Sequence, residues 1–125
     1  MNFFLVAVIL VGAYLIGSIP TAYIVSKGKK GTDIRQVGSR NMGAMNTIYT
    51  VGIWWGLLVL LIDVGKGAAV VALAAALNLS QIVVFIAGGL AIIGHSFPVC
   101  LGFHGGKGGA TAIGVLIYLM PWSIP

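Results

Sequence analysis

The sequence predicts an all-α membrane protein, a polytopic bundle of about four transmembrane helices with glycine-rich loops on the cytoplasmic face. Composition is the first observation behind this prediction: the chain of 125 residues is 59% hydrophobic and 7% charged, with a mean hydropathy of +1.09. The second is that the apolar residues gather in long, almost uninterrupted runs. Backbone groups in a bilayer must be satisfied within the segment, so these runs are expected to be helices rather than strands.

Four apolar segments can be marked out along the chain: 3–25, 53–77, 82–94 and 110–124. A membrane span needs roughly 20 apolar residues, and about 17 suffice. The first two segments reach that length alone, and the other two reach it with their flanking residues. The first is too long for a signal-peptide core and lacks a small-residue cleavage site, so we expect it to be retained. Residues 1–125 are expected to form a single membrane domain.

The cations set the expected orientation in the membrane. The first connection, from Ser26 to Asn46, holds most of them, the third holds one lysine, and the second holds none. The positive-inside rule therefore places the first and third connections in the cytoplasm and the N-terminus outside, in a multi-pass protein of the bacterial inner membrane type. For the three lysines of this connection, an interpretation as topology signals and anionic-lipid contacts alone has equal weight with a functional role. The cations concerned are Lys27, Lys29, Lys30, Arg35, Arg40 and Lys107.

An unusual polar loop, Gly38 to Asn46, lies within the first connection. Small, hydroxyl and amide residues surround Arg40 there, whereas a merely solvated loop more often carries Glu, Asp and Pro. Ser39, Asn41 and Asn46 are able to donate hydrogen bonds to phosphate oxygens. The alternative is a turn whose asparagine side chains bond their own backbone. We favour the ligand-binding interpretation.

Two ionisable residues interrupt the second apolar segment. Asp63 and Lys66 are three residues apart, so they are neighbours on one helix face and are expected to form an ion pair. A lone charge at the bilayer centre costs at least about 2.5–3.5 kcal/mol, so such residues usually face the bundle interior and serve a site. Gly65 and Gly67 would let another helix or a ligand come close. Asp63 is therefore predicted to be either a structural ion-pair partner or a site residue.

The third connection is a glycine-rich turn, Phe103 to Thr111, that precedes the fourth apolar segment. Glycine lets backbone N–H groups converge on an anion, and Lys107 adds a point charge. The positive end of the following helix would point at the same anion. His95, which ends the third segment shortly before Pro98, is able to bind an anion, move a proton or cap the helix. A phosphorylated ligand at the membrane edge is the resulting expectation.

Taken together, these stretches resemble the three motifs of the membrane-integral glycerol-3-phosphate acyltransferases that use acyl phosphate, the PlsY family. The first motif is similar to Gly17-Ser18-Ile19-Pro20 followed by Gly38 to Asn46, and the second to Asp63 to Gly67. The third is similar to Gly94 to Phe103, Gly105 to Gly108 and Ala110 to Gly114. Their order and spacing agree with the family over nearly the whole chain.

The resemblance implies acyl transfer from a fatty acyl phosphate to the 1-hydroxyl of glycerol 3-phosphate, giving lysophosphatidate and phosphate in phospholipid biosynthesis. It implies these two substrates and membrane lipids as partners, with no nucleic acid and no cofactor. Phosphate and oxyanion contacts are assigned to Ser39, Arg40, Asn41, Asn46, Lys66 and Lys107, with Gly105, Gly106 and Gly108 shaping the cradle. Catalysis is assigned to His95, Lys107 and Ser39. His95 is the one nearby group suited to be a general base at neutral pH, unless the substrate's own phosphate takes the proton.

The chain also departs from the family pattern. Arg40 stands where the family usually has glycine, and Tyr49 where it usually has arginine. Members usually have further membrane helices, so a C-terminal part or a partner is expected to complete this chain. The alternatives are a non-catalytic PlsY-like paralogue or fragment, and a small membrane transporter component; we see no inverted repeats, which would favour the latter.

Two other classes of site are excluded by the sequence. A P-loop requires glycine five residues before its Gly-Lys and a hydroxyl residue after it, and those positions hold Leu101 and Gly108. No metal site is expected, because cysteine, histidine and carboxylates are too few and too scattered for a ligand set.

Overall fold

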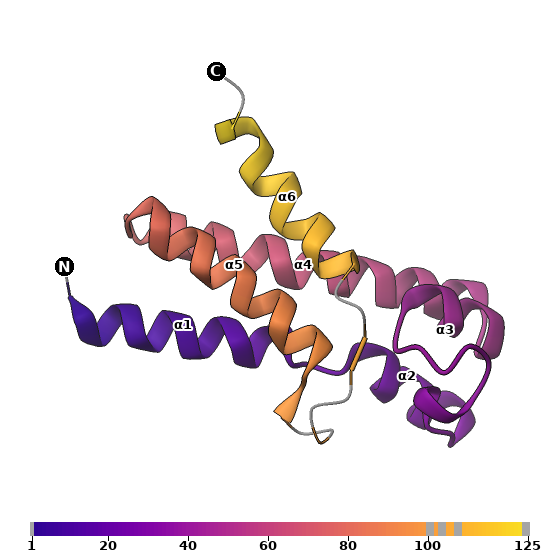
Figure 1. Cartoon of the computed structure of the whole chain (residues 1–125). Helices are drawn as coiled ribbons and strands as arrows, with labels where there is room; N and C mark the ends of the chain where they lie inside the picture. The colour runs from indigo at the N-terminus through magenta and orange to yellow at the C-terminus, as the bar shows by residue number, and fades with distance from the viewer. Residues whose placement is uncertain (1, 100–101, 103–104, 107–108, 124–125) are drawn as a thin grey trace.

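The computed structural model describes residues 2–99, 102, 105–106 and 109–123, and all regular structure within them is helical. The long helices within residues 3–96 lie side by side, and the C-terminal helix crosses them at an angle (Figure 1). This confirms the all-α prediction. The elements are α1 (Phe3–Gly17), α2 (Thr21–Lys30), the 3-10 helix η1 (Ile34–Gln36), α3 (Ala44–Thr50), α4 (Ile53–Ala76), α5 (Gln81–Ser96) and α6 (Gly109–Ser123).

The helices α4, α5 and α6 lie close to three of the four predicted segments. By length and composition, two stretches of the described chain are long and apolar enough to cross a membrane, Phe3–Lys30 and Ile53–Ala76. The other two apolar helices, Gln81–Ser96 and Gly109–Leu119, are shorter. The membrane character of the bundle agrees with the sequence, and the number of four spans stays a prediction.

The first apolar segment is interrupted, contrary to the single helix that its hydropathy predicts. Pro20 has no N–H and cannot continue the helical ladder. The N–H of Thr21 then bonds to the carbonyl of Ile19 at 3.0 Å, so it does not reach Gly17 as a continuous helix would require. The interruption leaves the carbonyl of Gly17 outside the ladder, at the end of α1.

Two helix pairs approach each other through small residues. α1 and α5 run in the same direction (Figure 1), and α6 crosses α4. At each crossing a glycine has no room for a Cβ because the backbone of the facing helix occupies that space. The pairs in contact are Gly17 with Ala91, Gly94 with Tyr14 and Ser18, Gly67 with Thr111, and Gly114 with Val64. The expected close approach is thus confirmed for Gly67 and wrong for Gly65, which has open space around it.

The polar first connection is itself folded. It forms α2, η1 and α3, and these cover the N-terminal half of α4, to the right in Figure 1. A small apolar core holds this part together, formed by the buried side chains of Ala22, Ile34, Met42 and Val59. The larger core lies between α1, α4, α5 and α6. This packing brings the loop after α2 close to the end of α5.

Candidate functional site

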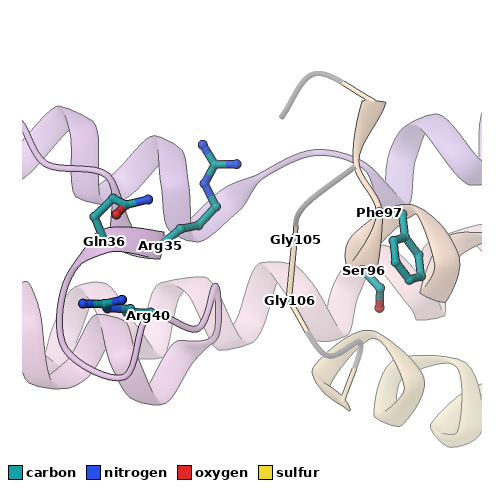
Figure 2. A pocket seen from close by; sticks show the side chains of 7 residues that line it. All are labelled: Arg35, Gln36, Arg40, Ser96, Phe97, Gly105 and Gly106. Carbon is teal, nitrogen blue, oxygen red and sulfur yellow. The ribbon is translucent and has the colours of Figure 1, made fainter. Parts of the chain in front are cut away.

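A pocket of about 560 Å³ lies between the loop that follows α2 and the C-terminal end of α5. Figure 2 shows the loop side chains on one side and the end of α5 with the glycine segment on the other. Two guanidinium groups and one hydroxyl line it, which is a donor set suited to phosphate or carboxylate. The lining residues are Arg35, Gln36, Arg40, Ser96, Phe97, Gly105 and Gly106.

Arg35 is held in place by Asp33, which lies two residues earlier. Its Nη2 donates to Oδ2 of the carboxylate at 2.8 Å and its Nε to Oδ1 at 3.0 Å. The Arg35 guanidinium holds the pKa of the Asp33 carboxyl below its usual value, and the same contact raises the pKa of Arg35. The guanidinium also lies over the Tyr23 ring, 5.4 Å from its centroid. Sequence reasoning missed Arg35 and Gln36 as site residues, although the short Asp33–Arg35 spacing was a usable signal.

Arg40 lines the same pocket from a strained backbone. Its φ of 65° lies in the left-handed region, which costs a residue with a Cβ roughly 1–2 kcal/mol. Glycine has no such cost, so the geometry explains why glycine would suit this position. The side chain is exposed on the pocket wall, as a phosphate contact requires. That contact stays a prediction.

Asn46 has a different role from the one predicted. Its side chain is 3% exposed. Its Nδ2 donates to the carbonyls of Ile34, Val37 and Asn41 at 3.1, 3.1 and 2.9 Å, and its Oδ1 accepts from the N–H of Ser39 at 3.1 Å. The amide is therefore used in holding the loop, which corrects the expectation that it contacts phosphate directly. Ser39 is exposed and Asn41 half-buried on this loop, and their phosphate contacts stay predictions.

Two glycines of the third connection, Gly105 and Gly106, cap α5. The N–H of Gly105 donates to the carbonyl of Ser96 at 2.9 Å, and that of Gly106 to the carbonyl of His95 at 3.2 Å. These amides are thus occupied, which corrects the expectation that they converge on an anion. The lack of a side chain matters instead, because a Cβ on Gly106 would lie 2.6 Å from Nε2 of His95. Lys107 and Gly108 lie outside the described residues.

A buried charged cluster lies beside the pocket. Nζ of Lys66 lies 3.1 Å from Oδ1 of Asp63, which is the ion pair that their spacing predicts. Nζ also lies 3.1 Å from Nδ1 of His95, a contact that no local sequence pattern predicts. The side chains of Asp63, Lys66 and His95 are 1%, 4% and 5% exposed.

The ammonium of Lys66 also donates hydrogen bonds to the backbone at the interruption between α1 and α2. It donates to the carbonyl of Gly17 at 3.0 Å and to that of Ile19 at 2.9 Å. A cation is well placed at the C-terminal end of a helix, where unpaired carbonyls carry partial negative charge. Nδ1 of His95 and Oδ1 of Asp63 are 3.7 Å apart, which is too long for a hydrogen bond.

Two further observations limit the chemistry available. Within the described residues no group of three or more His, Cys, Asp or Glu side chains is placed to hold a metal ion. Tyr49, where the family resemblance leads one to expect arginine, is exposed on α3 and does not line the pocket. The described pocket wall offers two guanidinium groups and one hydroxyl for binding an anion, with a buried ammonium and imidazole beside it.

Comparison with known proteins gives consistent matches. Residues 7–125 match the family model described as glycerol-3-phosphate acyltransferase. The chain is 52% identical over 121 residues to glycerol-3-phosphate acyltransferase 2 of Dehalococcoides mccartyi, covering 97% of this chain and 58% of the relative. It is 47% identical over 115 residues to glycerol-3-phosphate acyltransferase 2 of Moorella thermoacetica, covering 92% of this chain and 59% of the relative.

Solved structures match over the same part. A crystal structure of PlsY (YgiH), an integral membrane glycerol 3-phosphate acyltransferase in its glycerol 3-phosphate form, has a TM-score of 0.86 and 37% identity. The lysophosphatidic acid form has a TM-score of 0.81 and 33% identity. Each match covers 94% of this chain and 58% of the solved chain. The chain thus spans less than two thirds of these relatives, and by its family model, its sequence and its fold it belongs to the glycerol-3-phosphate acyltransferase family.

Proposed function

We propose that the chain takes part in acyl transfer from an acyl phosphate to the 1-hydroxyl of glycerol 3-phosphate, yielding lysophosphatidate and phosphate for phospholipid synthesis. One observation carries the proposal: the pocket at the end of α5 combines two arginines and a serine hydroxyl beside a buried ammonium. Such a site suits substrates that both carry phosphate. Its fold neighbour in the glycerol 3-phosphate form, with a TM-score of 0.86, supports the same substrate class.

The reaction requires positioning of the two substrates and stabilisation of negative charge, rather than activation of the acyl donor. The substrate hydroxyl oxygen attacks the acyl carbonyl carbon, the bond from that carbon to the phosphate oxygen breaks, and the departing phosphate takes the hydroxyl proton. An acyl phosphate is already an activated donor, so cations that hold both phosphates near each other lower the barrier. We assign this role to Arg35, Arg40 and Lys107, with Ser39 and Asn41 as further donors.

The placement in the membrane is part of the proposal. We place the chain in the bacterial inner membrane, with the N-terminus outside and the pocket on the cytoplasmic side. The basic last turn of α2, formed by Lys27, Lys29 and Lys30, lies at the pocket end of the bundle, as the positive-inside rule requires. Lys29 lies over the Trp55 ring, 4.2 Å from its centroid, an arrangement typical of a membrane interface.

The test measures phosphate release from palmitoyl phosphate by the purified chain in lipid vesicles, with and without glycerol 3-phosphate. Arg40→Gln and Lys107→Ala remove proposed anion contacts, and Lys30→Gln is the matched control because it removes an exposed cation outside the pocket. We expect release that requires glycerol 3-phosphate, falls at least about tenfold in the two site variants and is unchanged in the control.

Binding of glycerol 3-phosphate, measured separately by calorimetry, distinguishes the alternatives. Binding without turnover would indicate a non-catalytic relative, or a chain that needs the further part present in its longer relatives. A folded sample that neither binds nor turns over would refute the proposal. Uptake of glycerol 3-phosphate into vesicles without product would instead favour a transporter component.

A further inference from the structure

The hydrogen bonds of Lys66 account for every proton of a charged ammonium. A charged lysine has three N–H donors and no acceptor. Three atoms lie in hydrogen-bonding geometry with Nζ: the carbonyl oxygens of Gly17 and Ile19 at 3.0 and 2.9 Å, and Nδ1 of His95 at 3.1 Å. The carboxylate of Asp63 lies 3.1 Å away as a charge partner. An ammonium has no lone pair, so Nδ1 is the acceptor in the contact between the two groups.

Two other proton arrangements fit the contacts less well. A neutral lysine would have its lone pair free to accept from a protonated Nδ1, but the Asp63 carboxylate would then be buried beside no cation, which is costly. A protonated Nδ1 donating to Asp63 would need a shorter contact than the 3.7 Å observed. Among the described residues, Oδ1 of Asp63 has Lys66 as its ion-pair partner and no donor in hydrogen-bonding geometry. The geometry favours a charged Lys66 and an unprotonated Nδ1.

The other ring nitrogen lies next to a residue of the pocket wall. Nε2 of His95 lies directly behind Gly106, where a Cβ would lie 2.6 Å from it. Gly106 is a lining residue of the pocket that also holds Arg35 and Arg40. Among the described residues, the polar contacts of the His95 ring are those with Lys66 and Asp63, both made by Nδ1. Nε2 is therefore the nitrogen that remains for a molecule in the pocket.

We propose that Lys66 is a positioning residue that fixes His95 in the Nε2–H tautomer, so that His95 presents a hydrogen-bond donor to the anion pocket and is not the general base. A histidine whose Nδ1 accepts from an ammonium carries its proton on Nε2. A nitrogen that already carries a proton donates to an anion and cannot take a proton from a hydroxyl group. The inference deepens the proposed function and rests on it only for the identity of the anion.

The tautomer is measured directly by ¹⁵N NMR of histidine-labelled protein in lipid at neutral pH. The chain has two histidines, so His104→Gln leaves the signals of His95 alone. We expect a protonated Nε2 and an unprotonated Nδ1 with the shift of a hydrogen-bond acceptor. A protonated Nδ1, or a doubly protonated ring, would overturn the proposal without bearing on the acyl transfer reaction.

The role of Lys66 is tested by Lys66→Met, which should let the Nδ1 proton return and donate to Asp63. An unchanged tautomer in a folded variant would show that Lys66 does not set it. If that variant does not fold, Asp63→Asn decides the same point: the Nε2–H tautomer should persist, because Lys66 still donates to Nδ1. Its loss there would mean that the carboxylate sets the tautomer.

Activity separates a donor from a base. His95→Gln keeps an N–H donor near the position of Nε2 but cannot act as a base, whereas His95→Leu removes both functions. A donor role predicts a loss below about tenfold for glutamine and about 10²–10³-fold for leucine. Equal losses of about 10²–10⁴-fold in both variants would indicate a base and refute the inference. If the chain shows no turnover, the NMR result still decides the tautomer.

Discussion

Removal of the Lys66 ammonium is the perturbation with the largest expected effect on stability. Lys66→Met keeps a long apolar side chain of similar length but leaves a carboxylate that is 1% exposed without its cation. The carbonyl of Gly17, outside the ladder of α1, also loses its donor. Breaking a buried ion pair by removing one partner costs about 3–5 kcal/mol.

The magnitude is best checked by a double-mutant cycle. Asp63→Asn leaves the ammonium with its three acceptors, so it should cost less than Lys66→Met. The double variant has no unpaired charge, and it should cost less than the sum of the single variants by about 0.5–3 kcal/mol. Lys30→Met, which removes an exposed lysine, should change stability by less than about 0.5 kcal/mol.

Reversible unfolding in mixed micelles of rising SDS content provides the assay, with the fluorescence of the chain's three tryptophans as the signal. The expected order of stability is wild type, Asp63→Asn, then Lys66→Met. A Lys66→Met variant as stable as Lys30→Met, or single-variant costs that add without coupling, would refute the view that these charges form one buried unit.

Three further outcomes are expected. Gly114→Ala should lower the stability of the protein by about 1–3 kcal/mol, because the added Cβ would meet the carbonyl of Val64. Gly65→Ala has open space and should raise the stability by up to about 1 kcal/mol. The unfolding midpoints of the two variants check this difference. Arg40→Gly should relieve the strain of a positive φ, so the stability should be unchanged or up to about 1 kcal/mol higher. The KM for glycerol 3-phosphate should rise, because a cation of the pocket is lost. A lower stability of this variant would contradict the backbone strain at Arg40. The pKa of Asp33 is lowered from 3.8, so its contribution to stability is full above that value and lost as the pH falls through the folded-state pKa. The midpoint difference between wild type and Asp33→Asn should therefore be constant above about pH 5 and shrink below about pH 4, and a constant difference down to pH 3 would argue against the Arg35 contact.

Hydropathy and local spacing predicted much of this fold because both act within one segment. The bounds of α4, α5 and α6 follow from where apolar residues begin and end, and the Asp63–Lys66 pair follows from one helical turn. The interruption at Pro20 was missed because an apolar run with one proline still has the composition of a single span. His95 reaches Lys66 through packing between α4 and α5, which no local pattern encodes.

The polar loop shows a second limit of prediction. A buried asparagine that organises backbone and an exposed one that binds a ligand have the same side chain and occur in the same kind of loop. Asn46 is the former, as its four bonds to the backbone show. Its burial against the carbonyls of Ile34, Val37 and Asn41 depends on tertiary packing, so the sequence alone favoured a direct phosphate contact for a side chain that holds the loop.

The order in which the buried cluster is synthesised bears on how the chain enters the bilayer. Asp63 and Lys66 arrive on the same helix, so the inserting segment carries a neutral pair and not two separated charges. α1 precedes α4 in the chain, so the carbonyl of Gly17 at its end is already present as an acceptor for Lys66. Acceptors for Lys66 on α1 and α4 therefore precede α5 in the chain, and its ammonium does not depend on His95 alone for partners.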